Sequence, residues 1–159
     1  MSNKDFIQNY LSEVRRVAEA ISVAEIDKAI ELLFEAWGNG RYAFTCGNGG
    51  SASTATHFAC DLSKTTIVNG KKRFKAYCLN GNIHLMSALI NDEGFDNLFR
   101  EQLKNLFHEG DVLVCISVHG GAGKDKAGLW SQNLLKAMKY AKDMGGKTIG
   151  VGLAFALVS

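Results

Sequence analysis

The chain has 159 residues, of which 47% are hydrophobic, and its 18 Lys and Arg residues nearly balance its 16 Asp and Glu residues, for a formal charge of +2. This length can bury one sizeable core but does not support two ordinary domains. The near-neutral charge lacks the concentrated basic stripe that binding to a phosphate backbone requires, so we expect one domain and no nucleic-acid partner.

Two helices are expected before the first strand. Apolar residues recur at helical spacing along residues 5–21, at Phe6, Ile7, Tyr10, Leu11, Val14, Val17, Ala18 and Ile21. A second helix begins at Ser22, which forms a capping-box pattern with Glu25, and ends at Gly38 and Gly40. The apolar stripe of the first helix needs a partner surface. We expect that surface on another subunit, because the helices between the strands already cover the sheet.

After Gly40 the pattern changes to short β-forming runs that alternate with longer helical segments. The predicted strands are residues 42–46, 74–79, 112–118 and 148–151. The predicted helices between them are residues 51–62, 83–90 with 96–107, and 129–144. This order indicates right-handed crossovers and a three-layer α/β/α sandwich with a mainly parallel sheet. We expect leading helices in 1–40, a parallel α/β core in 41–152 and an apolar tail in 153–159.

The cysteines and the N-terminal residues indicate in which cellular compartment the protein is located. All four cysteines lie in apolar segments without a CxxC pair, at Cys46, Cys60, Cys78 and Cys115. This pattern suggests neither a disulfide framework nor a thiolate zinc site. The first residues lack the apolar core of a signal peptide, and no apolar run approaches the roughly 18 residues of a membrane span. We therefore expect a cytoplasmic protein without a membrane partner.

The strongest functional pattern is the turn at residues 46–51, where a strand passes through glycines directly into a helix. Glycines allow positive φ and close approach of a ligand, and the helix offers unpaired amides and its positive dipole end to an anion. The alternative is a tight turn without a ligand. Asn48 and Ser51 favour a site, because they add polar groups where open α/β sheets bind ligands. The turn has neither P-loop nor dinucleotide-fold spacing.

Residues 46–51 (CGNGGS) and 57–62 (HFACDL) resemble the signature of SIS (sugar isomerase) domains of the phosphoheptose isomerase type. The resemblance extends over most of the chain, including residues 91–95 (NDEGF) and 109–113 (EGDVL). It implies a flavodoxin-like sandwich, a homotetramer, and an aldose-ketose isomerase that interconverts sedoheptulose 7-phosphate and D-glycero-D-manno-heptose 7-phosphate through an enediol. It also implies one zinc ion as cofactor.

His57 and Asp61 are four residues apart on the predicted helix after the turn, so their side chains share one face and could share a metal. A lone His/Asp pair is more often simply a polar surface. In the family, the matching pair is His and Glu, which bind zinc together with a Gln and a His from the C-terminal helix. The resemblance implies that His57 is a metal ligand and that Asp61 is both a ligand and the catalytic base. Asp61 is one methylene shorter than the family's Glu.

Two further segments match substrate-binding positions of the family. Asn91 and Asp92 match an Asn-Asp pair that contacts the substrate, although by position alone a solvated turn is favoured. Ser117 remains from a Ser/Thr-rich phosphate loop, and His119 or Lys124 would compensate in a longer insertion. The expected substrate-binding residues are Asn48, Gly49, Gly50, Ser51, Asp61, Asn91, Asp92, Ser117, Val118 and His119.

The chain departs from the family at residues 153–159, where the family continues into another strand and a long helix. We therefore expect a shortened chain whose zinc site is incomplete or is completed by another subunit, since catalytic zinc usually has three protein ligands. The rival hypothesis is a noncatalytic SIS module that binds a sugar phosphate or a protein partner, as the DnaA initiator-associating proteins of this family do.

Overall fold

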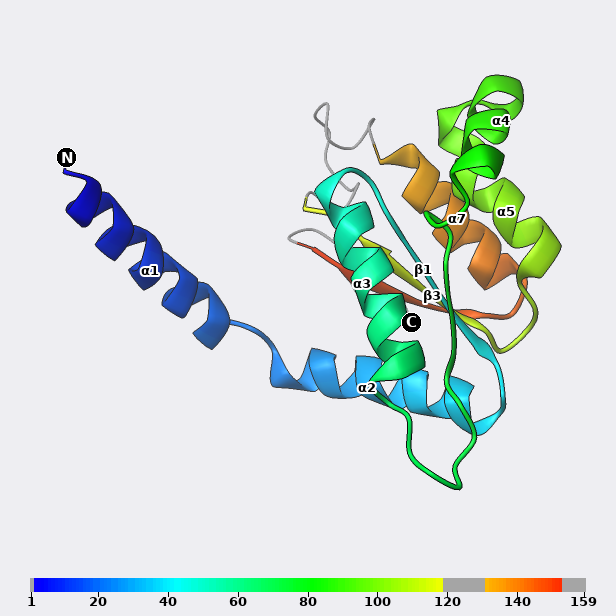
Figure 1. The fold of residues 1–159 in the computed structure, drawn as a ribbon, viewed down its shortest axis with the longest axis horizontal. Helices are drawn as coiled ribbons and strands as arrows, with labels where there is room; N and C mark the ends of the chain where they lie inside the picture. Colours follow the sequence, from blue (N-terminus) through cyan, green and yellow to red (C-terminus); the bar gives the residue numbers. More distant parts are fainter. Residues whose placement is uncertain (1, 119–130, 153–159) are drawn as a thin grey trace. The chain divides into compact units, whose positions relative to one another are not determined.

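The computed structural model describes residues 2–118 and 131–152 (Figure 1). By contacts it divides into two compact units, residues 1–30 and 31–159, and the boundary falls within the second helix. The elements in chain order are α1 (Asn3–Glu19), α2 (Val23–Gly38), β1 (Tyr42–Gly47), α3 (Gly50–Lys64), β2 (Lys75–Cys78), α4 (Ile83–Glu93), η1 (Phe95–Asn97), α5 (Leu98–Leu106), β3 (Val112–Ile116), α7 (Gln132–Asp143) and β4 (Lys147–Val151).

The first unit contains α1 and the beginning of α2. A capping box fixes the start of α1: the Ser2 hydroxyl accepts the Asp5 amide at 3.1 Å, and the Asp5 carboxylate accepts the Ser2 amide at 3.0 Å. The helix therefore begins at Asn3, two residues before the predicted start. These bonds from Ser2 lower the pKa of the Asp5 carboxyl. Within this unit no residue of α1 is buried, so its apolar stripe is exposed there.

The second unit is built on a four-stranded sheet in the order β2-β1-β3-β4, with every pair parallel. β1 is central: Tyr42 pairs with Lys75 on one side, and Ala43 pairs with Val112 on the other. The chain thus moves to one side of β1 for β2 and to the other side for β3 and β4. This is the flavodoxin-like order, and its switch point lies between β1 and β3. The prediction of a parallel α/β fold is confirmed.

Helices cover both faces of the sheet, as the alternation of side chains along β1 shows. Thr45 points to α3, where its hydroxyl donates a 2.9 Å hydrogen bond to the Ala55 carbonyl. Phe44 and Cys46 point the other way, into the cluster formed with α5 and α7. Figure 1 shows α3 on one side of the sheet and α5 and α7 on the other. Because both faces are covered, β1 is buried almost throughout, as expected for a parallel strand.

The main core lies between the sheet and the helices α5 and α7. Its buried members are Phe44, Cys46, Leu79, Leu98, Phe99, Leu103, Phe107, Leu113, Cys115, Leu134, Ala137, Met138 and Ala141. Burying one large aliphatic or aromatic side chain stabilises the fold by about 1.5–3 kcal/mol. Both β1 and β3 contribute side chains to this core, so its burial stabilises their pairing.

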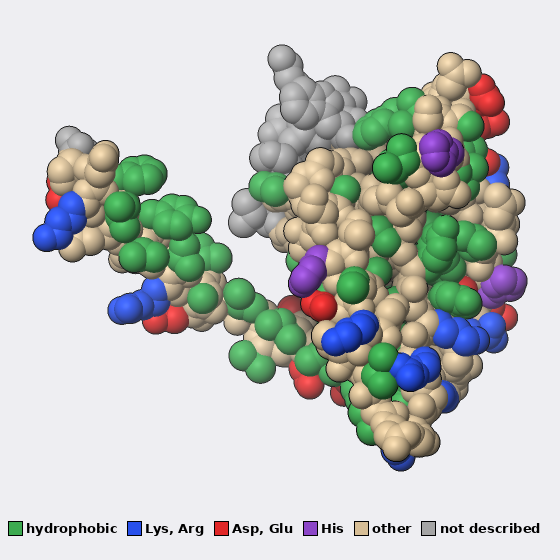
Figure 2. All heavy atoms as spheres, viewed as in Figure 1, with side chains coloured by type: hydrophobic (Ala, Val, Ile, Leu, Met, Phe, Trp, Pro, Cys, Tyr) green, Lys and Arg blue, Asp and Glu red, His purple; other side chains and the backbone are tan. Residues whose placement is uncertain are grey.

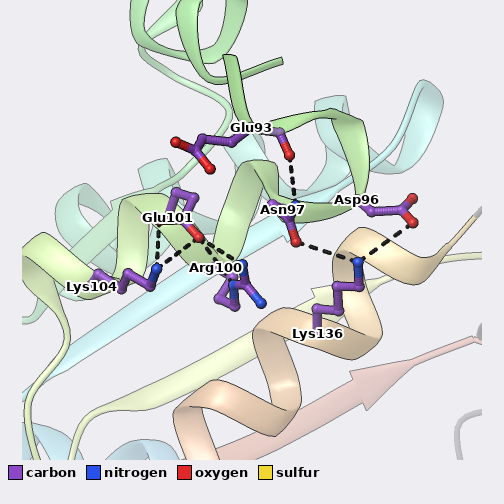
Figure 3. A network of polar contacts seen from close by, with 7 residues as sticks. All are labelled: Glu93, Asp96, Asn97, Arg100, Glu101, Lys104 and Lys136. Atoms are coloured by element: carbon purple, nitrogen blue, oxygen red, sulfur yellow. Dashed lines mark hydrogen bonds and ion pairs between the residues drawn. The ribbon is translucent and has the colours of Figure 1, made fainter. Parts of the chain in front are cut away.

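Figure 3 shows polar contacts that join η1 to α7, and a second group of contacts within α5. Lys136 of α7 donates to Asn97 at 3.3 Å and lies 3.6 Å from the Asp96 carboxylate. On α5, Glu101 accepts hydrogen bonds from Lys104 and Arg100. The bond from Lys104, more than that from Arg100, lowers the pKa of the Glu101 carboxyl against an opposing effect of burial.

Several boundaries differ from the sequence prediction. β3 ends at Ile116 rather than at residue 118, because Val118 turns out to solvent. α4 continues to Glu93, where Gly94 ends it with a positive φ of 81°. α7 begins at Gln132, and the predicted residues 129 and 130 lie outside the described part. Within the described residues, no helix is both long and apolar enough to span a membrane.

Candidate functional site

The connection from β1 to α3 is a tight turn that depends on its glycines. A Cβ at Gly47 would lie 2.6 Å from the backbone carbon and oxygen of Ser51, so only glycine fits there. Gly49 has φ of +55° and, as N-cap of α3, provides no side-chain oxygen. The amides of Ser51 and Ala52 bond to Asn48 and Gly49. Those two amides are thus satisfied within the turn, and within the described residues the amides of Gly49 and Gly50 are the donors left without an acceptor, as in anion-binding turns.

Asn80, which follows β2, holds the turn from one side. Its side-chain oxygen accepts the Gly47 amide at 3.1 Å, and its amide nitrogen donates to the Gly47 carbonyl at 3.0 Å. The sequence prediction missed Asn80. The signal was available, because Asn80 is a polar residue directly after the predicted strand 74–79, and neighbouring parallel strands end at the same edge of a sheet.

Asn133, in the first turn of α7, holds the turn from the other side. Its side chain exchanges two hydrogen bonds with that of Asn48, at 3.0 and 2.8 Å. Asn133 is fully buried. The sequence prediction missed this residue too, and no local pattern distinguishes it from other polar residues of a helix start.

The end of β3 lies beside the turn. Gly47 pairs in register with Ile116, so Asn48 and Ser117 leave adjacent strand ends at the switch point. Ser117 is largely buried, with 9% exposure, and its amide donates to the Val151 carbonyl at 3.0 Å. Val118 is exposed. His119 and Lys124 lie outside the described residues, so of the predicted second loop the structure places only Ser117 and Val118.

Two surface hollows of similar size lie at opposite edges of the sheet. One, of about 500 Å³, lies at the carboxyl end of β2 and is lined by Tyr77, Cys78, Gly81, Asn82, Ile83 and His84. The other, of about 510 Å³, lies at the amino edge, where Arg41, Glu109 and Lys147 line it. Open parallel sheets bind ligands at the carboxyl edge, and the glycine turn lies there. We therefore place the candidate site at that edge.

His57 and Asp61 lie together on α3, as predicted from their spacing. The His57 Nε2 atom is 3.1 Å from the Asp61 Oδ2 atom, and the side chains are 79% and 45% exposed. Figure 2 shows a histidine beside an acidic side chain on this face, over α3. At about 1.5 Å per residue, Asp61 is about 15 Å along the helix from Ser51, so within one chain the predicted base lies away from the turn.

The pair of His57 and Asp61 supplies two donors for a metal ion. Among the described residues, no group of three or more His, Cys, Asp or Glu side chains could hold a metal. Catalytic zinc takes three protein ligands and a water. The described donor set therefore does not by itself fit a catalytic zinc site.

Asn91 and Asp92 lie in the last turn of α4, both exposed, and the Asn91 amide nitrogen donates to the Asp92 carboxylate at 2.6 Å. Within the described residues, no hydrogen bond or ion pair joins either side chain to the β1–α3 turn. The structure thus brings together Asn48, Gly49, Gly50, Ser51 and Ser117 at one edge, and it places the pairs His57–Asp61 and Asn91–Asp92 on separate helices.

An uncapped glycine turn at the switch point of a parallel sheet, with hydroxyl and amide side chains around it, is typical of α/β domains that bind anions. The sequence profile of the SIS domain matches residues 6–152. The chain belongs to the SIS domain family.

Curated relatives support this assignment. The chain is 41% identical over 145 residues to the lincomycin biosynthesis protein LmbN of Streptomyces lincolnensis. This match covers 91% of this chain and 52% of the relative. It is 32% identical over 147 residues to the phosphoheptose isomerase of Aliarcobacter butzleri, with 91% of this chain and 72% of the relative covered. The chain thus spans about half the length of the first relative and under three quarters of the second.

A solved structure shares the fold. The phosphoheptose isomerase GmhA from Neisseria gonorrhoeae superimposes with a TM-score of 0.79 at 29% sequence identity, over 95% of this chain and 75% of that one. The resemblance expected from residues 46–51 and 57–62 is therefore confirmed at the level of family and fold.

Proposed function

We propose that the chain is an aldose-ketose isomerase domain that acts on a sugar phosphate, and that the substrate is sedoheptulose 7-phosphate. The observation that carries the proposal is the turn from Gly47 to Ser51 at the switch point between β1 and β3, with Ser117 at the neighbouring strand end. Uncapped amides there suit a phosphate group. The relatives named phosphoheptose isomerase favour the seven-carbon substrate.

The proposed reaction needs a base that removes a proton from one carbon and an acid that returns a proton to the neighbouring carbon. A base removes a proton from carbon 1 of the ketose while the carbonyl oxygen on carbon 2 gains one, which gives an enediol. A proton then returns to carbon 2, and the hydroxyl on carbon 1 loses its proton to become the aldehyde. No net oxidation occurs. Backbone amides of the turn hold the phosphate, and we assign Asp61 as the base.

Asp61 lies about 15 Å along α3 from Ser51. This distance is longer than one small substrate, so Asp61 and the turn of the same chain would not contact the same sugar phosphate. This distance, together with the uncovered apolar stripe of α1, supports a homo-oligomer, proposed as a tetramer, whose sites combine residues of neighbouring subunits. We propose a cytoplasmic location, since all four cysteines are unpaired, as in a reducing compartment.

We propose one zinc ion as cofactor, although the described residues supply only two of its ligands. His57 and Asp61 would supply two ligands, and the remaining ligands would come from outside the described residues, for example from another subunit. Metal analysis of the purified protein tests this: about one zinc per subunit, lost in a His57→Ala variant, supports the assignment, and its absence after zinc supplementation contradicts it.

The second candidate is a noncatalytic SIS module that binds a sugar phosphate or a protein partner. The incomplete set of metal donors in the described residues favours it. Turnover separates the two. Sedoheptulose 7-phosphate and six-carbon ketose phosphates would be incubated with the zinc-supplemented chain, and aldose formation followed. Conversion of one of them supports the isomerase, and binding without conversion supports the module. The lincomycin biosynthesis relative does not narrow the substrate, since its name gives no sugar.

A further inference from the structure

The side chains of Asn48 and Asn133 form a reciprocal amide pair between the β1–α3 turn and the start of α7. Asn48 Nδ2 donates to Asn133 Oδ1 at 3.0 Å, and Asn133 Nδ2 donates to Asn48 Oδ1 at 2.8 Å. Asn133 is 0% exposed, whereas Asn48 is half-buried at the edge of the candidate site. One member of the pair is thus fixed in the core, and the other reaches the surface.

The Leu134 amide determines which way the pair is oriented. It donates to Asn133 Oδ1 at 2.9 Å and also to the Ser131 carbonyl at 3.1 Å. A backbone N–H can only donate, so the oxygen of Asn133 must face it, and the nitrogen of Asn133 must face Asn48. Asn48 can then form both bonds in one orientation only. The backbone of α7 thereby sets the direction of a side chain in the turn.

The pair leaves Asn48 with unused hydrogen-bonding capacity. An amide nitrogen carries two hydrogens and an amide oxygen has two lone pairs, and Asn133 takes one of each. No other described side chain bonds to the Asn48 amide. Because Asn48 directly follows Gly47 at the switch point, the remaining N–H is a donor of fixed direction at the edge where the ligand is proposed to bind.

We propose that Asn133 is a positioning residue for the sugar-phosphate ligand, acting through Asn48, whose second side-chain N–H donates to the ligand. The inference rests on the function proposed above. A donor held in place before binding costs less ordering when the ligand arrives. Asn133 itself does not touch the ligand, because it is buried behind Asn48.

The test is a double-mutant cycle on ligand affinity. Asn133→Leu removes both bonds to Asn48 at similar volume and without adding charge, and Asn133→Ser keeps an acceptor near the Leu134 amide but does not reach Asn48. Affinity for sedoheptulose 7-phosphate is measured by calorimetry for these variants, for Asn48→Ala and for the double variants. We expect each single change to weaken binding about tenfold, the size of one lost hydrogen bond, and the doubles to be no weaker than Asn48→Ala.

Thr45→Val is the matched control. It removes another buried hydrogen bond of β1, from Thr45 to the Ala55 carbonyl, and leaves Asn48 untouched. We expect it to lower the melting temperature without the loss of affinity. If Asn133 had only a structural role, its variants would behave like this control.

Each other outcome overturns the inference. Unchanged affinity in folded Asn133 variants, or losses that add in the double variants, would remove the positioning role while the proposed function stands. Failure of both Asn133 variants to fold, with Thr45→Val folded, would assign Asn133 to the core alone. If the unaltered chain bound no sugar phosphate, the proposed function would fail together with the inference.

Discussion

Cys46 and Cys115 lie side by side on β1 and β3, with their sulfur atoms 3.4 Å apart. They are register partners in the sheet, one residue before the strand ends that flank the candidate site. Both are fully buried. The floor of the site is therefore apolar, and the polar groups of the turn begin directly above it.

This relationship predicts the order in which the thiols react. Burial raises the pKa of the Cys46 thiol well above its usual value, and the neighbouring Cys115 adds to the shift, so little thiolate forms. Cys60 is exposed on α3. In the native protein we expect iodoacetamide to label Cys60 and to spare Cys46 and Cys115, as read by mass spectrometry of peptides. Unfolded protein, labelled at all four positions, is the control. Equal rates at Cys46 and Cys60 would contradict the buried pair.

Gly47→Ala tests whether the turn is as tightly closed as its geometry indicates. The added methyl group would meet the Ser51 backbone at 2.6 Å, so we expect a loss of about 1–3 kcal/mol in unfolding free energy, together with weaker sugar-phosphate binding. Urea unfolding and calorimetry measure the two effects. Gly38→Ala is the matched control, because a Cβ there meets nothing within 4 Å. Two variants of equal stability would show that the turn has room to spare.

Ser51→Ala tests the hydroxyl in the first turn of α3. A hydrogen bond to a charged group contributes about 1.5–3 kcal/mol, so we expect sugar-phosphate affinity to fall about tenfold or more while stability changes little. Ser63→Ala provides the comparison on the same helix, where its exposed hydroxyl lies about 18 Å away. The assignment of Ser51 to the site would not survive equal affinity in both variants.

Asp61 is tested by two substitutions in the turnover assay. Asp61→Asn keeps the size but removes the base, and we expect turnover to fall by about 10²–10⁴. Asp61→Glu restores the longer carboxylate of the family, and we expect activity equal to or above that of the unaltered chain. Asp143→Asn breaks a comparable exposed pair, with Lys139 at 2.6 Å, and should leave turnover unchanged. Full activity of Asp61→Asn would exclude Asp61 as the base.

Glu101 gives a prediction for stability against pH. Its pKa is lowered in the folded state, chiefly by the hydrogen bond from Lys104, so it stabilises the fold above the ordinary glutamate pKa of about 4.3. This contribution is lost as pH falls through the folded-state pKa. At pH 7 we expect Glu101→Gln to cost about 0.5–1 kcal/mol in urea unfolding, and at pH 3 we expect the difference to shrink. A difference that grows on acidification would reverse the sign of the argument.

The sequence was sufficient for the features that depend on neighbouring residues. The turn at Gly47 to Ser51 was predictable because strand, glycines and helix follow one another directly. The spacing of His57 and Asp61 likewise sufficed to place them on one helix face. The capping box at Ser2 is equally local, yet it was overlooked, and α1 was expected to begin later.

The contacts that support the turn are not local in sequence, and only Asn80 had a signal there, as a polar residue after a predicted strand. Asn80 is 33 residues from Gly47, and Asn133 is 85 residues from Asn48. Such contacts depend on the strand order, which places β2 on one side of β1 and α7 beside its end. Asn91 and Asp92 show the converse: a motif match gave them a role at the site, but the described structure connects them only to each other.

The placement of β3 beside β1 has a consequence for the order in which the protein forms during synthesis. β2 is synthesised before β3 and is therefore the first strand that can pair with β1. Tyr42 of β1 pairs with Lys75 of β2, whereas Ala43 of β1 pairs with Val112 of β3, which is synthesised later. Contacts this distant in sequence slow folding, because a long loop has to close before they form. On the ribosome, β1 therefore has one bare edge until the chain has grown past residue 116. A nascent chain that stalls before that point has the glycine turn but lacks the neighbouring strand end, and one edge of β1 stays unpaired.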